Sequence, residues 1–400
     1  MTLQLCMDKI EELLTRGVAN IIPNKQKLEE LLKSNKKLNA YLGIDPTSTR
    51  IHLGHTVLLR KLQTLADLGH NVTFLIGDFT ALIGDTSDKD SERPALTSQE
   101  IEKNFQTYKK QAEKILNFSK IKVHYNGEWL SELNFKKVIE LSMKFSANDL
   151  NSRELIKKRL NEGSRVGLHE FLYPVMQGYD SYFMDTDLQI GGTDQTFNMQ
   201  SGRTLQKIWR NKESFIIATE FLMGTDGRKM SKSWGNAIWL DDSPQDMFAK
   251  VMAINDDLII QYFTLATNTD IKEIEKIKSE IKSGKNSMDV KKELAKIIVA
   301  ELHSEKNAMA AQENFEQTVQ HKELPEDMLV YLQSKTFKQN IVDLLVKTKL
   351  AESKSDAKRL IEQGGVAVDD KIITPNQEVN IQENSIIRVG KRKFVKIKLN

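Results

Sequence analysis

The chain has 400 residues, of which 40% are hydrophobic and 28% charged, with 20 glycines and seven prolines. This composition is typical of a globular protein with about two to four domains, and it excludes collagen-like and low-complexity chains. No run of about eighteen apolar residues occurs, so a membrane-spanning helix is not expected. The acidic start, with Asp8, Glu11 and Glu12, does not suit a signal or transit peptide. Cys6 is the only cysteine, which excludes an internal disulfide and favours a reducing, cytoplasmic location.

The excess positive charge lies at the C-terminal end. Residues 341–400 hold 12 Lys or Arg and 8 Asp or Glu, whereas the whole chain has a net charge of only +3. A small basic module at the end of a near-neutral chain predicts an acidic partner, most often nucleic acid. On charge alone, a solvated lysine-rich tail explains the pattern equally well.

The first half alternates short apolar runs with amphipathic stretches. Residues 39–44 and 72–77 predict buried strands, and the apolar spacing over residues 54–68 predicts a helix between them. A strand, a helix and a second strand form a βαβ unit, which implies a parallel sheet. Further strands are predicted at residues 122–124, 188–191 and 215–218. We therefore expect a Rossmann-type, doubly wound α/β domain over residues 1–235.

The second half changes character twice. Residues 236–335 have a helical pattern without strand candidates and predict an all-α bundle. A polar stretch near residues 334–339 separates the bundle from a small α+β domain at residues 340–400. In this last domain we expect helices at residues 341–345 and 355–363 and strands at residues 366–368, 372–373, 386–389 and 394–398.

A histidine pair opens the helix that follows the first predicted strand. The sequence there is His52-Leu53-Gly54-His55. A helix N-terminus after a parallel strand presents free N–H groups and a positive dipole end, which suits a phosphate. Gly54 lets a base or ribose approach the backbone, and both histidines can donate hydrogen bonds to phosphate oxygens. The tetrapeptide alone fits a helix start without a ligand equally well.

A second basic element lies near the predicted end of the α/β domain. Lys229 and Lys232 belong to the segment KMSKS, which Gly224 and Gly227 precede. On a mobile loop the two lysines can close over a polyphosphate and neutralise a leaving pyrophosphate. Such a charge run, taken by itself, is also compatible with a solvated surface.

Together the two elements resemble the HIGH and KMSKS signatures of class I aminoacyl-tRNA synthetases, which activate an amino acid with ATP on a Rossmann-type domain. Four segments are similar to segments of tyrosyl-tRNA synthetases, in the same order and at similar spacing. They are residues 41–55 (YLGIDPTSTRIHLGH), 83–93 (IGDTSDKDSER), 173–180 (YPVMQGYD) and 189–195 (QIGGTDQ). The resemblance spans essentially the whole chain.

The chemistry of the pocket residues agrees with this resemblance. Tyr41 and Asp180 offer a hydroxyl and a carboxylate suited to a phenolic O–H. Tyrosyl-tRNA synthetase is itself the known case in which such a buried polar site rejects phenylalanine by about 10⁵. The resemblance implies that Tyr41 and Asp180 read the tyrosine hydroxyl, while Asp85, Tyr173 and Gln177 hold the ammonium group. The tryptophanyl-tRNA synthetases, which are related to the tyrosyl family, are expected to lack the Tyr41 and Asp180 pair.

The resemblance also implies a nucleotide site and catalytic residues. The expected ATP-binding residues are Gly43, Asp45, Thr47, Gly54, Gly191, Gly192, Asp194 and Lys232. Asp194 is the natural acceptor for ribose hydroxyls, and Gln195, assigned to the tyrosine site, can orient the reacting carboxylate and phosphate. The expected catalytic residues are His52, His55, Lys229, Lys232, Lys89 and Arg93. Lys89 and Arg93 match a mobile loop that closes over pyrophosphate, although surface solvation also explains their charges.

ATP is expected as a substrate that carries Mg²⁺, and no metal-ligating set is predicted in the chain. Residues 355–366 resemble the RNA-binding domain shared with a small-subunit ribosomal protein, which occurs at the C-terminus of many bacterial tyrosyl-tRNA synthetases. The expected RNA-binding residues are Lys358, Arg359, Lys371, Lys391, Arg392 and Lys393. The resemblance further implies tRNA(Tyr) as partner, an anticodon-side role for residues 236–335, and a homodimer with contacts near residues 128–164.

Two alternatives from other classes remain at this point. A nucleotidyltransferase would share the histidine helix start, but it would not need the helical bundle or the basic terminal module. A non-catalytic RNA-binding protein built on an inactive synthetase would be expected to have lost a lysine from residues 229–233 or a histidine from residues 52–55, and all are present.

Overall fold

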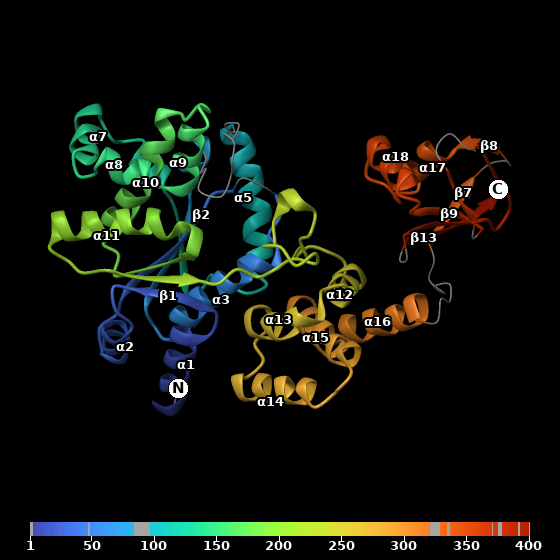
Figure 1. Cartoon of the computed structure of the whole chain (residues 1–400), viewed down its shortest axis with the longest axis horizontal. Coiled ribbons are helices and arrows are strands. Elements are labelled where there is room, and N and C mark those ends of the chain that lie inside the picture. Colours follow the sequence, from blue (N-terminus) through green and yellow to red (C-terminus); the bar gives the residue numbers. More distant parts are fainter. Residues whose placement is uncertain are drawn as a thin grey trace. The chain divides into compact units, whose positions relative to one another are not determined.

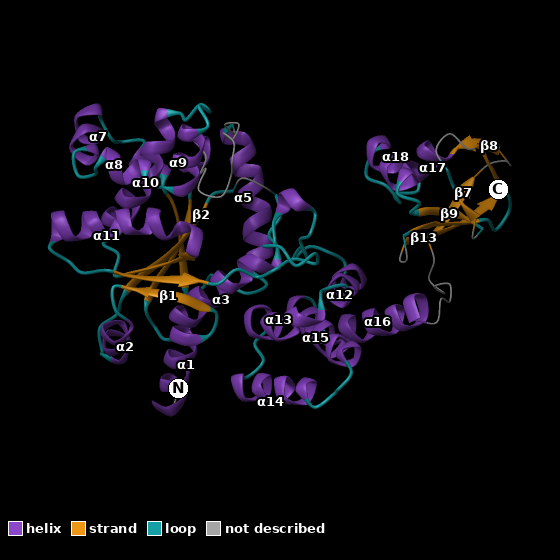
Figure 2. Cartoon of the chain, in the orientation of Figure 1, coloured by secondary structure: helices purple, strands orange, loops and turns teal. Residues whose placement is uncertain are grey.

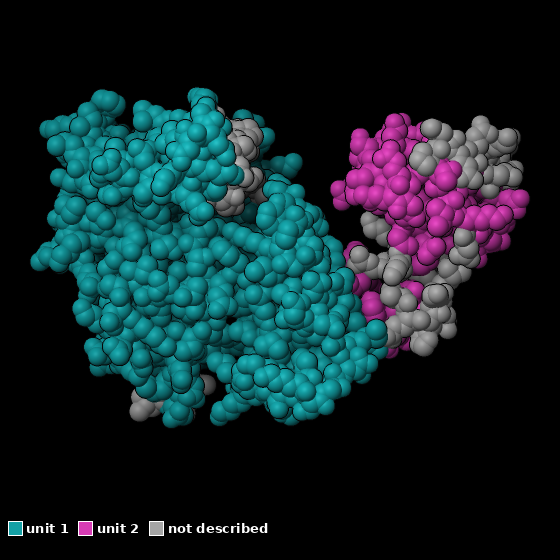
Figure 3. Space-filling model, viewed as in Figure 1, with its two compact units in different colours: residues 1–242, 250–303 teal, residues 243–249, 304–400 magenta. Residues whose placement is uncertain are grey.

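The computed structural model describes residues 3–46, 49–83, 97–320, 329–333, 337–369, 371–374, 378–390 and 393–399. The chain forms two compact units, residues 1–242 with 250–303, and residues 243–249 with 304–400 (Figure 3). The helices of the described segments include none with the length and apolar character needed to cross a membrane.

A six-stranded sheet forms the centre of the first unit. Its strands are β1 (Val18–Ile22), β2 (Asn39–Ile44), β3 (Asn71–Ile76), β4 (Ile121–Tyr125), β5 (Leu188–Gly192) and β6 (Phe215–Thr219). The order is β1-β6-β5-β2-β3-β4, and all neighbours are parallel except β1, which pairs antiparallel with β6. This confirms the expected α/β class with a parallel sheet. The edge strand β1 was not predicted.

Helices cover both faces of this sheet (Figures 1 and 2). In Figure 1, α10 and α11 lie on one side of the strands, and α1 and α2 lie on the other. The helices that precede residue 243 are α1 (Leu3–Thr15), α2 (Lys25–Lys33), α3 (Leu53–Asp67), α4 (Thr80–Ile83), α5 (Ser98–Ala112), α6 (Gly127–Leu130), α7 (Phe135–Ser142), α8 (Ala147–Asn151), α9 (Glu154–Asn161), α10 (Leu168–Phe183) and α11 (Thr196–Arg210).

Local capping explains where several helices begin. Asn24 accepts a hydrogen bond from the Lys27 N–H at the start of α2, and Thr97 with Glu100 forms a capping box at the start of α5. These side chains satisfy N–H groups that have no partner within the helix.

Helices also dominate the region that follows residue 243. They are α12 (Pro244–Met252), α13 (Ile259–Ala266), α14 (Ile271–Lys282), α15 (Ser287–Leu302) and α16 (Glu305–Phe315). Residues 250–303 group with the sheet in the first unit. Arg16 fixes α13 there, because its guanidinium donates to the backbone oxygens of Phe263, Thr264, Thr267 and Thr269 at 2.6–3.0 Å. Phe263 and Thr264 lie in the last turn of α13, and Thr267 and Thr269 follow its last residue, Ala266; backbone oxygens at a helix end lack helical partners.

The C-terminal part of the second unit is a small α+β domain. Its helices are α17 (Ile341–Lys347) and α18 (Lys354–Glu362), and its strands are β7 (Leu329–Gln333), β8 (Phe337–Asn340), β9 (Val366–Val368), β10 (Lys371–Ile372), β11 (Glu378–Ile381), β12 (Ile386–Val389) and β13 (Lys393–Leu399). The larger sheet has the order β10-β9-β12-β13-β7, and β11 pairs with β8. The expectation of no strand before residue 335 is wrong, because β7 pairs parallel with β13. Strands β8 and β11 were also not predicted.

Candidate active site

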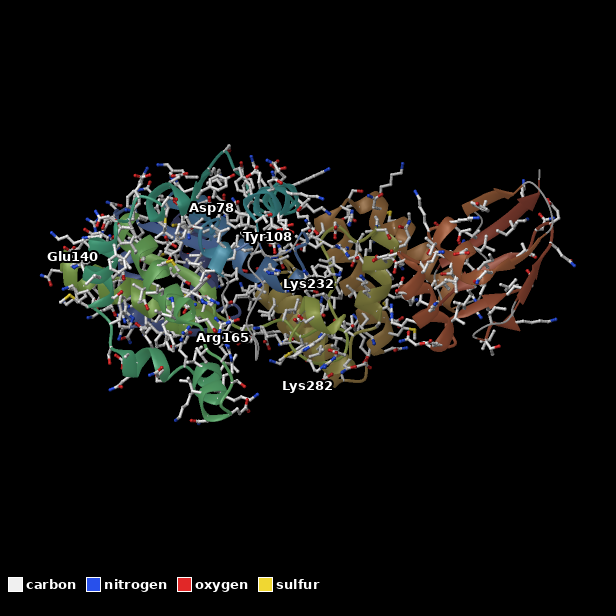
Figure 4. All side chains as sticks on the ribbon, turned by 90° about the horizontal axis from the view of Figure 1, so that it is seen from above. Asp78, Tyr108, Glu140, Arg165, Lys232 and Lys282 are labelled. Atoms are coloured by element: carbon white, nitrogen blue, oxygen red, sulfur yellow. The ribbon has the colours of Figure 1, made fainter. Side chains whose placement is uncertain are left out.

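A cavity of about 660 Å³ opens at the carboxyl ends of β2, β5 and β6 and at the start of α3. The chain proceeds from β2 toward β3 and β4, and later from β5 to β6 on the other side, so β2 and β5 flank the point where the sheet order reverses. Ligands of doubly wound sheets bind at this point. Figure 4 labels Tyr108 and Lys232, two residues that line the cavity.

Most of the predicted site residues line this single cavity. They are Tyr41, Gly43, Asp45, His52, Gly54, His55, Tyr173, Gln177, Asp180, Gly191, Gly192, Asp194, Gln195, Lys229 and Lys232. Residues far apart in the sequence therefore meet at one place. Thr47, Asp85, Lys89 and Arg93 lie outside the described residues.

One end of the cavity is built around the buried carboxyl of Asp180 on α10. The Trp129 indole N–H donates to Asp180 Oδ1 at 2.7 Å, and the Asn126 amide donates to Oδ2 at 3.1 Å. Tyr41, on β2, donates from its hydroxyl to Gln189 Oε1 on β5 at 3.0 Å. Burial raises the pKa of the Asp180 carboxyl to about 8, against the lowering effect of the two hydrogen bonds. Burial and the nearby Asp180 also raise the pKa of the Tyr41 hydroxyl, which therefore remains a donor.

A hydrogen-bonded chain connects this end of the cavity to Asp45. Asn126 donates to Thr80 Oγ1 at 3.0 Å, and Thr80 donates to Asp45 Oδ1 at 2.8 Å. The Tyr173 hydroxyl donates to Asp45 Oδ2 at 2.8 Å. Gly77 makes room for this carboxylate, because a Cβ at that position would lie 1.9 Å from Asp45 Oδ1. Tyr173 and Asp45, assigned separately from the sequence, thus hold each other in place.

Sequence reasoning missed four polar residues of this network, Thr80, Asn126, Trp129 and Gln189. Gln189 carried a signal, because it is a polar residue inside an apolar run that forms a fully buried strand. The other three follow strand ends, but only the folded chain brings them to Asp45 and Asp180.

The two histidines lie together at the start of α3. Their ring centroids are 3.9 Å apart, and the His52 backbone N–H lies 3.3 Å from His55 Nδ1. The same Nδ1 lies 3.3 Å from the His52 carbonyl oxygen, so the neutral His55 ring has a backbone partner in either tautomer. Burial lowers the pKa of His55 to about 4, and burial, His55 and Lys229 together lower the pKa of His52 well below its usual value. Both rings are therefore neutral hydrogen-bond donors near pH 7 rather than charges.

The KMSKS segment lines the cavity beside the start of α3, where a Cβ at Gly54 would lie 3.9 Å from Met230 Cβ. Lys229 Nζ lies 3.0 Å from Asp194 Oδ2 and 3.8 Å from the centre of the Phe221 ring. Lys232 begins a short 3-10 helix and is exposed. Lys229 thus lies beside Asp194, the carboxylate expected to bind the ribose. The exposed Lys232 is available to contact a phosphate chain.

The predicted RNA-binding residues belong to the second unit. Lys358 and Arg359 are exposed on α18, where Arg359 pairs with Asp356, and Lys371 is exposed on β10. Lys393 begins β13, whereas Lys391 and Arg392 lie outside the described residues.

Comparison with known families agrees with this site. The family model of class I tRNA synthetases (W and Y) matches residues 33–320, and that of the S4 domain matches residues 339–384. The first match covers more than half of the chain, so the chain belongs to the class I tRNA synthetases of this group and is a ligase. The resemblance stated from the sequence is confirmed.

Individual relatives narrow the comparison to one member of the group. The chain is 41% identical over 396 residues to tyrosine–tRNA ligase 2 of Clostridium acetobutylicum, with 98% of each chain covered. It is 42% identical over 389 residues to the tyrosine–tRNA ligase of Thermotoga maritima, with 96% of each covered.

Solved structures share the fold at lower identity. The tyrosyl-tRNA synthetase of Archaeoglobus fulgidus, complexed with L-tyrosine, has a TM-score of 0.61 at 23% identity and covers 76% of this chain and 99% of its own. A C-terminally truncated mitochondrial tyrosyl-tRNA synthetase of Aspergillus nidulans has a TM-score of 0.64 at 22% identity, with coverages of 78% and 93%.

Proposed function

We propose that this chain is a tyrosine–tRNA ligase, which makes tyrosyl-adenylate from L-tyrosine and ATP and then transfers tyrosine to the 3′ end of tRNA(Tyr). The observation that carries the proposal is the buried Asp180, held by Asn126 and Trp129 in the same cavity as Tyr41. A phenolic hydroxyl that enters this end satisfies polar groups that phenylalanine leaves unpaired, which is the basis of selection in this enzyme class. Tyr173 and Gln177, with Asp85, hold the ammonium group at the other end of the amino acid.

ATP binds between the α3 start and the KMSKS segment. Asp194 accepts the ribose hydroxyls, Gly43, Asp45, Thr47, Gly54, Gly191 and Gly192 surround the adenylate, and Mg²⁺ arrives with the phosphates. Lys229 Nζ lies 3.0 Å from Asp194 Oδ2, so this lysine is next to the proposed nucleotide site.

The first step needs positioning and charge stabilisation rather than a covalent enzyme intermediate. A tyrosine carboxylate oxygen attacks the α-phosphorus in line, and the bond from that phosphorus to the bridging oxygen breaks as pyrophosphate leaves. Gln195 orients the carboxylate and the phosphate. His52 and His55 donate neutral N–H groups to phosphate oxygens, while Lys229, Lys232, Lys89 and Arg93 neutralise the charge of the departing pyrophosphate.

In the second step a hydroxyl of the terminal tRNA adenosine attacks the adenylate carbonyl, and AMP leaves. The S4 domain supplies Lys358, Arg359, Lys371, Lys391, Arg392 and Lys393 for phosphate contacts with the tRNA. The helical region that follows the KMSKS segment serves the anticodon side. We place this reaction in the cytoplasm.

A second copy of the chain is the proposed partner of an apolar surface on α7. Phe135, Ile139 and Met143 follow one another at intervals of four residues and therefore lie on one face of α7. Phe135 and Met143 are 77% and 75% exposed, and Ile139 between them is also exposed. Side chains of this size rarely remain uncovered together on a monomer, so we propose a homodimer.

The test is amino-acid-dependent exchange between ATP and labelled pyrophosphate, with tyrosine, tryptophan and phenylalanine as parallel substrates. We expect exchange with tyrosine alone. Exchange with tryptophan would keep the class and overturn the assignment of Tyr41 and Asp180. No exchange with any amino acid would contradict the activation reaction.

A further inference from the structure

The lysine segment is the end of a compact loop. Residues 222–231 fold back on themselves, since the Gly224 N–H donates to the Arg228 carbonyl at 2.7 Å and the Met230 N–H donates to the Leu222 carbonyl at 2.9 Å. Both lysines of the KMSKS segment depend on this fold, because Lys229 directly precedes Met230 and Lys232 follows it by two residues.

One buried amide connects the loop to the segment that follows it. Asn236 is 3% exposed. Its Nδ2 donates to Asp226 Oδ1 at 2.7 Å and to the Lys229 carbonyl at 3.1 Å, and its Oδ1 accepts from the Ser231 N–H at 2.9 Å. A single side chain therefore fixes the backbone on both sides of Met230 and ties it to the Asp226 carboxylate.

The surroundings of Asn236 are shaped for this side chain. A Cβ at Gly224 would lie 2.5 Å from the Asn236 amide, so glycine is needed for the close approach. The Asn236 backbone carbonyl also accepts from the Thr225 N–H at 3.1 Å. Asn236 thus binds both arms of the loop, and its amide group supplies a donor and an acceptor at once.

We propose that Asn236 is a positioning residue for the activation step, which holds Lys229 and Lys232 where the pyrophosphate forms. The proposal rests on the proposed function of the site. Asn236 is not among the residues that line the cavity, so it acts through the lysine backbone rather than on the substrates. Loss of its hydrogen bonds frees the loop, and a displacement of about 1 Å in a reacting group lowers a rate by about 100-fold.

The first experiment separates positioning from binding. In Asn236→Ala we expect the rate of tyrosyl-adenylate formation to fall on the order of 10–100-fold, while the Kd for tyrosine, measured without ATP, stays within about twofold of the wild-type value. The matched control is Asn71→Ala, which removes another side-chain amide bond, from Asn71 Nδ2 to Asn39 Oδ1, at the amino ends of β2 and β3. An equal fall in both variants, or an unchanged rate in Asn236→Ala, overturns the proposal.

Replacing Asn236 by a carboxylate gives a second readout, a pH dependence of the rate that a merely structural role of Asn236 would not produce. Asn236→Asp sets a carboxylate against Asp226, whose other charged neighbour is Arg228 and which also influences the Tyr262 hydroxyl. Two such carboxylates share a proton as the pH falls, and a protonated carboxyl can again donate. We therefore expect the adenylate rate of Asn236→Asp, relative to wild type, to rise from pH 8 to pH 6.

The double variant Asp226→Asn with Asn236→Asp restores a donor and an acceptor between these two positions. We expect it to recover at least part of the rate lost in Asn236→Asp. A pH-independent defect without recovery overturns the proposal, and these two variants decide the question if Asn236→Ala does not fold. Failure of the proposed function is distinct, because the wild-type protein would then show no tyrosine-dependent exchange.

Discussion

At the scale of single residues, Asp180 receives its two described hydrogen bonds from neutral donors, the Asn126 amide and the Trp129 indole. Each carboxyl oxygen can accept a further hydrogen bond, which a phenolic hydroxyl in the cavity supplies. In Asp180→Asn the acceptor weakens while the shape is kept. Above pH 8, where the carboxyl is ionised, we expect kcat/KM for tyrosine in pyrophosphate exchange to fall by roughly 10–100-fold, because a hydrogen bond to a charged group contributes about 1.5–3 kcal/mol.

The preference for tyrosine over phenylalanine should shrink in the same variant, because phenylalanine makes no such bond. The matched control is Asp257→Asn, an exposed carboxyl changed in the same way. An Asp180→Asn protein that retains wild-type kcat/KM for tyrosine would remove Asp180 from the tyrosine site.

The protonation of Asp180 also affects stability. Burial raises its pKa from 3.8 to about 8, so between about pH 4 and pH 8 the folded protein holds a proton that the unfolded chain has released. The free energy of unfolding therefore decreases as the pH rises through this window, by at most about 1.4 kcal/mol per pH unit from this group. Asp180→Asn removes the contribution, so its thermal midpoint relative to wild type should increase from pH 5 to pH 8.

The difference between the two proteins is the informative quantity in this calorimetric measurement. His52 and His55, whose pKa values are lowered, change the stability of both proteins in the opposite direction below about pH 6.5, and the subtraction cancels their effect. A difference in midpoint that stays constant with pH would contradict a raised pKa of Asp180.

At the scale of elements, the start of α3 acts through neutral imidazoles. The pKa of about 4 for His55 means that its ring does not titrate between pH 6 and 8. We expect His55→Ala to reduce exchange by roughly 100-fold across this range, because one hydrogen-bond donor to a developing charge is lost. His55→Gln, whose amide nitrogen lies near the position of Nε2, should retain more activity than His55→Ala. A defect that appears only below pH 6.5 would indicate a charged histidine instead.

The inner strands of the parallel sheet were predictable because strands buried on both faces appear as continuous apolar runs. Strand β1 lies at the edge with a mixed burial pattern, and β7, β8 and β11 are short strands stabilised by partners elsewhere in the chain. Their pairing depends on residues far away in the sequence, so no local sequence pattern predicts it.

The same distinction separates the site residues. The motif residues meet because they lie at the ends of strands and helices. The order of these elements along the chain brings those ends together at one edge of the sheet. The roles of Thr80, Asn126 and Trp129 arise only from contacts with Asp45 and Asp180 in the folded chain.

At the scale of the whole molecule, the C-terminal unit should make tRNA binding sensitive to salt. Lys358 and Arg359 are exposed neighbours on α18. Each phosphate contact adds roughly 0.7–0.9 to the slope of log K against log salt. We expect Lys358→Ala with Arg359→Ala to weaken tRNA(Tyr) binding and to reduce this slope by about 1–2. The control is Lys25→Ala with Lys27→Ala, which removes two exposed charges from the first unit. A slope that falls equally in both double variants would contradict a specific role of α18.

Charged substitutions on the apolar face of α7 test the proposed homodimer. Leu141 anchors the helix by packing with Val175 and Leu205, so Phe135 and Met143 can be changed without opening this core. In a two-fold interface every substitution occurs twice, and each large apolar side chain contributes about 1.5–3 kcal/mol when it is buried. We therefore expect Phe135→Asp with Met143→Asp to weaken a dimer by at least about 100-fold and to leave a monomer at micromolar concentration, measured by light scattering. Met309→Asp, at an exposed methionine on α16, should keep the wild-type mass. If the double variant also keeps that mass, the second copy binds elsewhere and the exposed face of α7 has another partner.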